Sequence, residues 1–276
     1  MSILNNKPNY KQSLLQSKEF LFFLFLFFLN SLLSAQNIQD KIILTHDDSL
    51  ALENVIVEKY YFSDSTDYSD TLKNALPIGS ITYRIFIDMK PEYKLQLVYG
   101  NKNHELNIET STSIFNDMEA DAVTGFNINT KYIYKGNIAL DSWITMGAAS
   151  RGFTGIPRVE DKDEISLITN RESFKKADGL TKAILPNFTV YNLNLKPFEY
   201  DTTASRFSTN NGGWAAPGGA KGPNADNKVL IAQITTNGKL SFKLNVQIGT
   251  PTGGYIKFVA DKPEENEIQF VGLNFK

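Results

Sequence analysis

Strict two-residue alternation of apolar and polar side chains is the feature that most constrains how this chain can fold. In GKLSFKLNVQIG (238–249) every second position is apolar, from Leu240 to Ile248, and the positions between them are polar. Successive side chains of an extended strand point to opposite faces, so this pattern buries one face and exposes the other. The segment therefore predicts a half-buried β-strand.

The same alternation recurs along most of the chain. SITYRIFIDM (80–89) shows it, and YKLQLVYG (93–100) follows after a turn at 90–92. Further candidate strands are 54–62, 104–112, 131–136, 142–147, 187–195, 227–236, 254–260 and 266–275. Short strands separated by Gly, Pro, Asn and Asp are typical of antiparallel sandwiches and barrels. We predict an all-β, antiparallel β-sandwich, jelly-roll-like, with long loops, as a single domain over 54–276.

Helical segments are few in this prediction. The segments 116–125 and 172–180 are expected to form one or two short helices. The polar, charged stretch 151–182 is expected to be an excursion on one face of the domain, and 36–53 a short lead-in to it.

The amino terminus has the anatomy of a secretory signal peptide. Lys7, Lys11 and Lys18 precede the apolar run FLFFLFLFFL at 20–29, and small residues follow. That run reaches about 15 Å, half of a ~30 Å hydrocarbon core, which favours a cleaved signal over a membrane anchor. We predict a signal peptide over 1–35, cleaved after Ala35, and a secreted, periplasmic or cell-surface protein that meets the membrane only before cleavage.

Composition narrows the classes of partner. The chain contains no cysteine, so an exported domain of this length has to be held by its core rather than by disulfides. Its net charge is −2, without a basic block, which argues against nucleic acid as a partner. The strong preference for lysine over arginine favours a bacterial source.

The order of motifs resembles a known kind of module. The motifs that carry the resemblance are TYRIF…VYG within 79–116, LDSW within 140–150 and NGGW…VLIAQ within 211–254. They resemble an uncharacterised β-rich module that recurs in exported bacterial proteins, including many from Bacteroidota, and the resemblance spans about 55–275. It implies export and a β-rich fold, and it implies no chemistry.

Histidine chemistry has little support. The chain has two histidines, His46 and His104, and neither lies near a recognisable nucleophile motif. Without cysteine, two distant histidines also make a poor zinc site. Both are expected to be exposed histidines of turns or strands.

Two acidic loops are candidates for calcium, whose preferred ligands are loop oxygens. The candidate ligands are Asp64, Asp67 and Asp70 in the first loop, and Asp117, Glu119 and Asp121 in the second. Neither loop matches the EF-hand spacing, so a solvated acidic turn is the alternative at each. Calcium is the one cofactor that the sequence suggests.

A hydrolase acting on extracellular polymer is an alternative function. A glycosidase needs two carboxylates facing each other across a cleft, roughly 5–9.5 Å apart. Asp88, Glu109 and Asp141 lie on or beside predicted strands. Asp141, next to Trp143, is the most interesting of these, although an Asp entering a turn also bonds nearby backbone amides.

The two tryptophans, Trp143 and Trp214, are candidate sugar-stacking residues. Trp143 lies in an alternating strand, where core packing competes with ligand contact. Trp214 lies in the glycine-rich segment 208–230, which is expected to be a structured loop. That segment is not a phosphate loop, because Lys221 is followed by Gly222-Pro223 and then by a strand. Trp214 either anchors the loop in the protein or contacts a ligand.

These observations favour a non-catalytic binding or surface-interaction module whose partner is a polysaccharide or another cell-envelope component. The candidate ligand-binding residues are Trp214, Trp143 and Asp141. The alternatives are the extracellular hydrolase and a structural module without a small-molecule ligand. An exposed Trp214 beside other aromatic residues would favour binding, whereas a buried Trp214 together with a sealed surface would favour the structural module.

Overall fold

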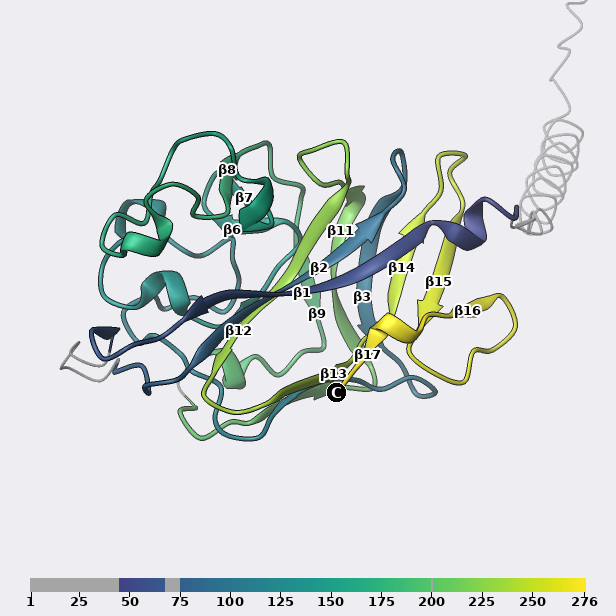
Figure 1. The fold of residues 1–276 in the computed structure, drawn as a ribbon. Helices are drawn as coiled ribbons and strands as arrows, with labels where there is room; N and C mark the ends of the chain where they lie inside the picture. Colours follow the sequence, from purple (N-terminus) through teal and green to yellow (C-terminus); the bar gives the residue numbers. More distant parts are fainter. Residues whose placement is uncertain (1–44, 68–74, 200) are drawn as a thin grey trace, which may run out of the picture. The chain divides into compact units, whose positions relative to one another are not determined.

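A computed structural model describes residues 45–67, 75–199 and 201–276 of the chain (Figure 1). The predicted signal peptide and Asp70 lie outside the described residues. Residues Leu44–Lys276 form one compact unit. Within the described ranges, no helix is both long and apolar enough to cross a bilayer.

The prediction of an all-β sandwich is confirmed. Sheet A has the strand order β1-β2-β12-β5, sheet B β16-β15-β14-β3-β11-β9, sheet C β10-β4-β13-β17 and sheet D β6-β7-β8. The strands are β1 (Leu52–Phe62), β2 (Ile81–Met89), β3 (Lys94–Gly100), β4 (Leu106–Thr110), β5 (Trp143–Ile144), β6 (Ala148–Ser150), β7 (Phe153–Gly155), β8 (Leu180–Lys182), β9 (Thr189–Tyr191), β10 (Arg206–Thr209), β11 (Gly212–Ala220), β12 (Lys228–Thr236), β13 (Leu240–Lys243), β14 (Val246–Gly249), β15 (Tyr255–Val259), β16 (Glu267–Gln269) and β17 (Asn274–Phe275). Strands β15 and β16 pair in parallel.

The helices of the described residues are single 3-10 turns. They are η1 (Asp48–Leu50), η3 (Thr130–Tyr132), η4 (Ile138–Leu140), η5 (Arg158–Glu160), η6 (Glu172–Phe174), η7 (Lys196–Phe198) and η8 (Val271–Leu273). The expected helix at 116–125 is wrong, because this segment forms turns, and 172–180 contains only η6. The expected strand at 131–136 is also wrong. The Asn129 side chain accepts a hydrogen bond from the Lys131 amide and starts a 3-10 turn there instead.

The glycine-rich segment 208–230 is not the long loop that its composition predicts, because it contains the end of β10, all of β11 and the start of β12. Strand β11 lies between β9 and β3, and a side chain at Gly213 would meet the neighbouring backbone: a Cβ there would lie 2.4 Å from the Val98 carbonyl oxygen. Gly218 and Gly219 have φ angles of 87° and 80° and form a bulge where the register shifts. The glycines therefore allow close strand packing and a bulge.

Sheets B and C are joined by bent strand pairs. Along the chain, β3 of sheet B is followed by β4 of sheet C. Likewise, β10 and β13 of sheet C are followed by β11 and β14 of sheet B. The predicted single strand at 238–249 is therefore two strands. At the bend, the Asn245 side-chain amide donates to the carbonyl oxygens of Tyr99 at 3.1 Å and His104 at 3.3 Å. This amide holds the corner between the two sheets.

The main apolar core lies between sheets A, B and C. Strand β2 contributes Ile85 and Ile87, strand β11 contributes Trp214, and strands β4 and β13 add Ile108 and Phe242. Alternation places these side chains on the inner face of each sheet, as the sequence predicts.

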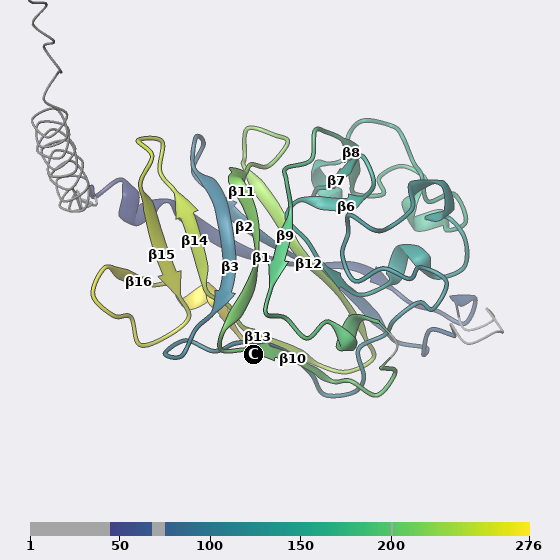
Figure 2. The same cartoon turned by 180° about the vertical axis from the view of Figure 1, so that it is seen from behind.

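Sheet A is covered on its other face as well. Phe86 of β2 packs there with Trp143 and Phe174, in a second core contributed largely by the loop-rich segment 115–182. Figures 1 and 2 both show this segment, with β6, β7 and β8, at the opposite end of the domain from β15 and β16. The excursion expected on one face thus includes buried apolar residues, and β2 is buried on both faces rather than half-buried.

A buried arginine ties this segment to sheet A. Arg84 donates from Nε to Gln233 Oε1 and from Nη1 to the Gly179 carbonyl oxygen, both at 2.9 Å. Its guanidinium carbon lies 3.5 Å from the ring centre of Tyr60. The guanidinium therefore has partners in sheet A (Gln233 and Tyr60) and in the covering segment (Gly179), which explains a charged side chain buried in the sheet.

Candidate functional site

The face of sheet B that points away from the core carries the best candidate for a ligand site. Val98, Trp214, Val246 and Phe258 point into the core. Their chain neighbours therefore point outward. In register across the sheet, one outward row is Thr189, Ala215, Leu97, Gln247 and Lys257, and a second is Tyr191, Gly213 and Tyr99.

These rows border a hollow of about 270 Å³. Its polar and aromatic lining residues are Tyr99, Asn101, Tyr191, Asn211, Gln247 and Lys257. The hollow combines aromatic rings, side-chain amides and one ammonium group. It can therefore contact an apolar surface of a ligand and also donate and accept hydrogen bonds.

Tyr191 is the exposed aromatic residue of this hollow. It lies on the edge strand β9, is 41% exposed and pairs with Gly213 of β11. A Cβ on Gly213 would lie 3.0 Å from the Tyr191 hydroxyl oxygen, so the phenol lies closely over the glycine. Because the neighbouring strand offers no side chain here, the tyrosine lies against the sheet and leaves part of its ring to solvent.

Tyr99 lies on the other side of Gly213 and is only 5% exposed. Its hydroxyl is buried and has no hydrogen-bond partner. Burial raises the pKa of Tyr99, and the nearby charge of Glu267 adds to the rise. Tyr99 therefore stays a neutral phenol at the base of the hollow.

Two side-chain amides, those of Gln96 on β3 and Gln247 on β14, are held by each other. Gln247 donates from Nε2 to Gln96 Oε1 at 2.9 Å. Gln96 lies over Gly249, because a Cβ on that glycine would be 2.5 Å from Gln96 Nε2. Next to them in register, Lys257 lies between Gln247 of β14 and Glu267 of β16.

His104 is not the exposed turn histidine that the sequence predicts. It is 3% exposed, and its Nε2 lies 2.7 Å from Glu267 Oε2. Asn101 helps to fix His104 there. The Asn101 side-chain oxygen accepts a hydrogen bond from the backbone amide of His104 at 2.8 Å, which tightens the turn between β3 and β4. With Glu264, the two residues place one potential metal-ligand atom each within 4.8 Å of one another. His46 is exposed, as expected.

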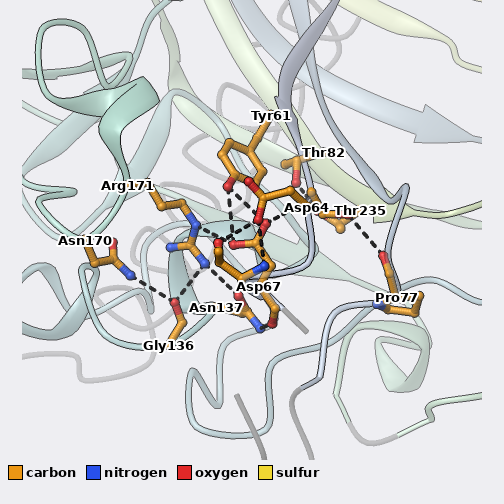
Figure 3. Close-up of polar contacts among 12 residues, drawn as sticks. Tyr61, Asp64, Asp67, Pro77, Thr82, Gly136, Asn137, Asn170, Arg171 and Thr235 are labelled. Atoms are coloured by element: carbon orange, nitrogen blue, oxygen red, sulfur yellow. Dashed lines mark hydrogen bonds and ion pairs between the residues drawn. The ribbon is translucent and has the colours of Figure 1, made fainter. Parts of the chain in front are cut away.

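The first acidic loop is organised by an ion pair (Figure 3). Asp67 Oδ1 accepts from Arg171 Nε at 3.0 Å, and Oδ2 accepts from the Tyr61 hydroxyl and the Asp64 amide, both at 3.0 Å. The Asp64 carboxylate accepts from the amide and hydroxyl of Thr66. Asp67 is thus buried against a cation of the protein itself, an arrangement that favours a structural anchor over a calcium ligand.

The second acidic loop meets Asp141. The Asp117 amide donates to Asp141 Oδ1 at 2.8 Å, while Asp117 Oδ1 accepts from the amides of Glu119 and Ala120. Asp117 and Asp141 are buried, whereas Glu119 and Asp121 are exposed. Burial raises the pKa of Asp141 well above its ordinary value, and the charge of Asp117 adds to the rise. Asp141 therefore bonds a backbone amide, as its alternative interpretation requires, but this amide belongs to Asp117, 24 positions away, rather than to a neighbouring residue.

Both tryptophans are core residues in the structure. Trp143 is 1% exposed and Trp214 is fully buried. The Trp214 indole donates to the Thr145 carbonyl oxygen at 2.9 Å. Their burial favours packing over ligand contact, and Trp214 anchors a strand rather than a loop.

The carboxylates considered for a hydrolase have separate surroundings. Glu109 of β4 pairs with Arg206 at 3.0 Å in sheet C. Asp88 lies on β2 of sheet A, where burial raises its pKa and Lys228 opposes the rise. Asp141 is buried beside Asp117, so the structure does not pair it with either of the other two.

Reasoning from the sequence missed Tyr191, Gln247 and Lys257 as site residues. A usable signal was present for Gln247 and Lys257, because both occupy polar positions of alternating segments. The sequence did not show that β9, β11, β3, β14 and β15 are neighbours. Comparisons with protein-family models, with curated proteins and with solved structures find no match to this chain.

Proposed function

We propose that this chain is an exported, non-catalytic binding module that binds carbohydrate of an extracellular or cell-envelope polymer on the outward face of sheet B. The observation that carries the proposal is Tyr191, a tyrosine that is 41% exposed, at a hollow lined with side-chain amides. This face takes the place of Trp214, Trp143 and Asp141, which are buried.

The chemistry of the hollow matches the chemistry of a sugar ring. A pyranose presents an apolar C–H face and a rim of hydroxyl groups. The apolar face of an aromatic ring packs against the C–H face of the sugar. The side-chain amides of Asn101, Asn211 and Gln247 can donate hydrogen bonds to the sugar hydroxyl groups and accept hydrogen bonds from them, because each amide has both donors and an acceptor.

The location of the hollow also supports the proposal. It lies on a regular sheet, and backbone pairing between β9, β11, β3 and β14 fixes the spacing of its side chains. A site of this kind needs little ordering when a ligand binds, which favours affinity for a partner that offers few contacts.

A glycan array followed by calorimetry on the array hits tests this function. Tyr191→Ala is expected to weaken binding at least about tenfold, because the stacking ring is lost. Tyr134→Ala is the matched control, since Tyr134 is 44% exposed and lies in the segment that covers sheet A. The proposal fails if the wild type binds no glycan, or if Tyr191→Ala binds as tightly as Tyr134→Ala does.

Export is tested separately. Expression of the full chain in a bacterium, followed by fractionation and amino-terminal sequencing, is expected to give a mature protein that starts at Gln36 outside the cytoplasm. An uncleaved cytoplasmic product would contradict it.

A further inference from the structure

A compact group of metal-ligating side chains lies where sheets B and C meet. His104 comes from the turn between β3 and β4, while Glu264 and Glu267 come from the segment around the start of β16. Their potential ligand atoms all lie within 4.8 Å of one another. The side chains of His104 and Glu267 are buried, with 1% and 5% exposure, and Glu264 is exposed. The group therefore has a buried base and one member open to solvent.

Hydrogen bonds between the two segments hold this group in place. Asn103 Nδ2 donates to Glu264 Oε1 at 2.6 Å, and the Glu264 amide donates to Glu267 Oε2 at 2.9 Å. The Asn245 side-chain amide also donates to the His104 carbonyl oxygen at 3.3 Å. The three ligand residues are thus oriented by neighbours, which is a usual property of protein metal sites.

Two buried polar atoms beside the group have no hydrogen-bond partner. One is the Tyr99 hydroxyl oxygen and the other is His104 Nδ1. The Asn245 side-chain amide bonds the carbonyl oxygens of both Tyr99 and His104, so these two residues are neighbours at the corner between sheets B and C. Buried polar atoms are rarely left without a partner, so a ligand near the Tyr99 hydroxyl would satisfy that group.

We infer that His104, Glu264 and Glu267 bind a divalent transition-metal ion of the zinc class. One imidazole nitrogen with two carboxylate oxygens is a donor set that suits such ions, whereas calcium prefers oxygen ligands alone. On binding, His104 would act as a neutral imidazole that carries its ring hydrogen on Nδ1, so that Nε2 and Glu267 Oε2 bind the metal in place of the hydrogen bond between them. Three protein ligands leave a fourth position for water.

Calorimetric titration of the metal-free chain with zinc chloride tests the site directly. The full-length product is stripped with EDTA, desalted and titrated with zinc chloride alone and with calcium chloride alone. We expect one zinc ion per chain, much weaker binding of calcium, and a melting temperature that rises with zinc concentration because the ion binds the folded chain.

Glu264→Gln is the informative variant, because its side chain is exposed and glutamine keeps an oxygen to accept the Asn103 bond. It is expected to weaken zinc binding by at least about tenfold. Glu265→Gln, an exposed acidic neighbour outside the group, should bind zinc as the wild type does. The inference is overturned by absent zinc binding, by equal calcium binding, by unchanged affinity in Glu264→Gln, or by an equal loss in both variants. None of these readouts depends on a glycan, so the metal site and the proposed function stand or fall independently.

Discussion

The indole nitrogen of Trp214 donates a hydrogen bond to the carbonyl oxygen of Thr145 at 2.9 Å, across 69 positions of the chain. This bond connects β11 of sheet B with the segment that follows β5 of sheet A. The tryptophan of the glycine-rich segment is therefore an internal anchor, and its neighbours Gly213 and Ala215 belong to the outward face of the sheet.

Replacing this anchor should cost stability. Trp214→Ala removes a fully buried ring and leaves a cavity, so the free energy of unfolding should fall by about 3–5 kcal/mol. Urea unfolding followed by circular dichroism measures the change. Tyr134→Ala, at an exposed position, should stay within about 0.5 kcal/mol of the wild type. A loss below about 1 kcal/mol for Trp214→Ala would contradict the anchoring role.

The ion pair between Arg171 and Asp67 should be equally important for the segment that covers sheet A. Both side chains are buried, so Arg171→Met leaves an unpaired buried carboxylate and should cost about 3–5 kcal/mol. The exposed pair of Lys175 and Glu172 is the control, and Lys175→Met should change stability by about 0.5 kcal/mol or less. Chemical unfolding measures the free energy of unfolding of both variants. Similar losses of stability in Arg171→Met and Lys175→Met would show that the buried ion pair contributes no more than the exposed one.

Asp141 should make the fold less stable as pH rises through the acid range. Because burial raises its pKa in the folded protein above the unfolded value of about 3.9, the folded state holds this proton more tightly. Its contribution is therefore most favourable at low pH and is lost as pH rises towards the folded pKa. Asp141→Asn keeps an oxygen acceptor for the Asp117 amide and cannot ionise.

The measurement is the difference in unfolding free energy between Asp141→Asn and the wild type from pH 3 upward, in which the other carboxylates cancel. The variant should gain relative stability with rising pH. A difference that stays flat, or that falls, would show that Asp141 is not held in its neutral form.

Gly213→Ala tests the close packing under Tyr191. The added Cβ would lie 2.4 Å from the Val98 carbonyl oxygen and 3.0 Å from the Tyr191 hydroxyl oxygen. The strand has to shift, so stability should fall by about 1–3 kcal/mol. Urea unfolding provides the value, and an unchanged midpoint would mean that β9 does not lie closely over this glycine.

Much of the strand content could be predicted from the sequence. Alternation is a local property, and the segments at 54–62, 80–89, 93–100 and 227–236 correspond closely to β1, β2, β3 and β12. Errors occurred where composition misled, because glycines that suggested a structured loop over 208–230 are among those that let β11 pack between two neighbouring strands. A helix at 116–125 was likewise expected from local pattern, whereas Asp117 forms a turn and bonds Asp141.

The sequence by itself determined that the chain forms short strands with one apolar side, because the two-residue period of a strand can be read from neighbouring positions. Only the tertiary structure decided which strands become neighbours. It placed Tyr191 beside Tyr99 across Gly213, buried Trp214, and brought His104 to within 2.7 Å of Glu267 from 163 positions away. These relationships depend on pairing between distant segments, and the energy of such pairing lies in contacts that no local pattern records.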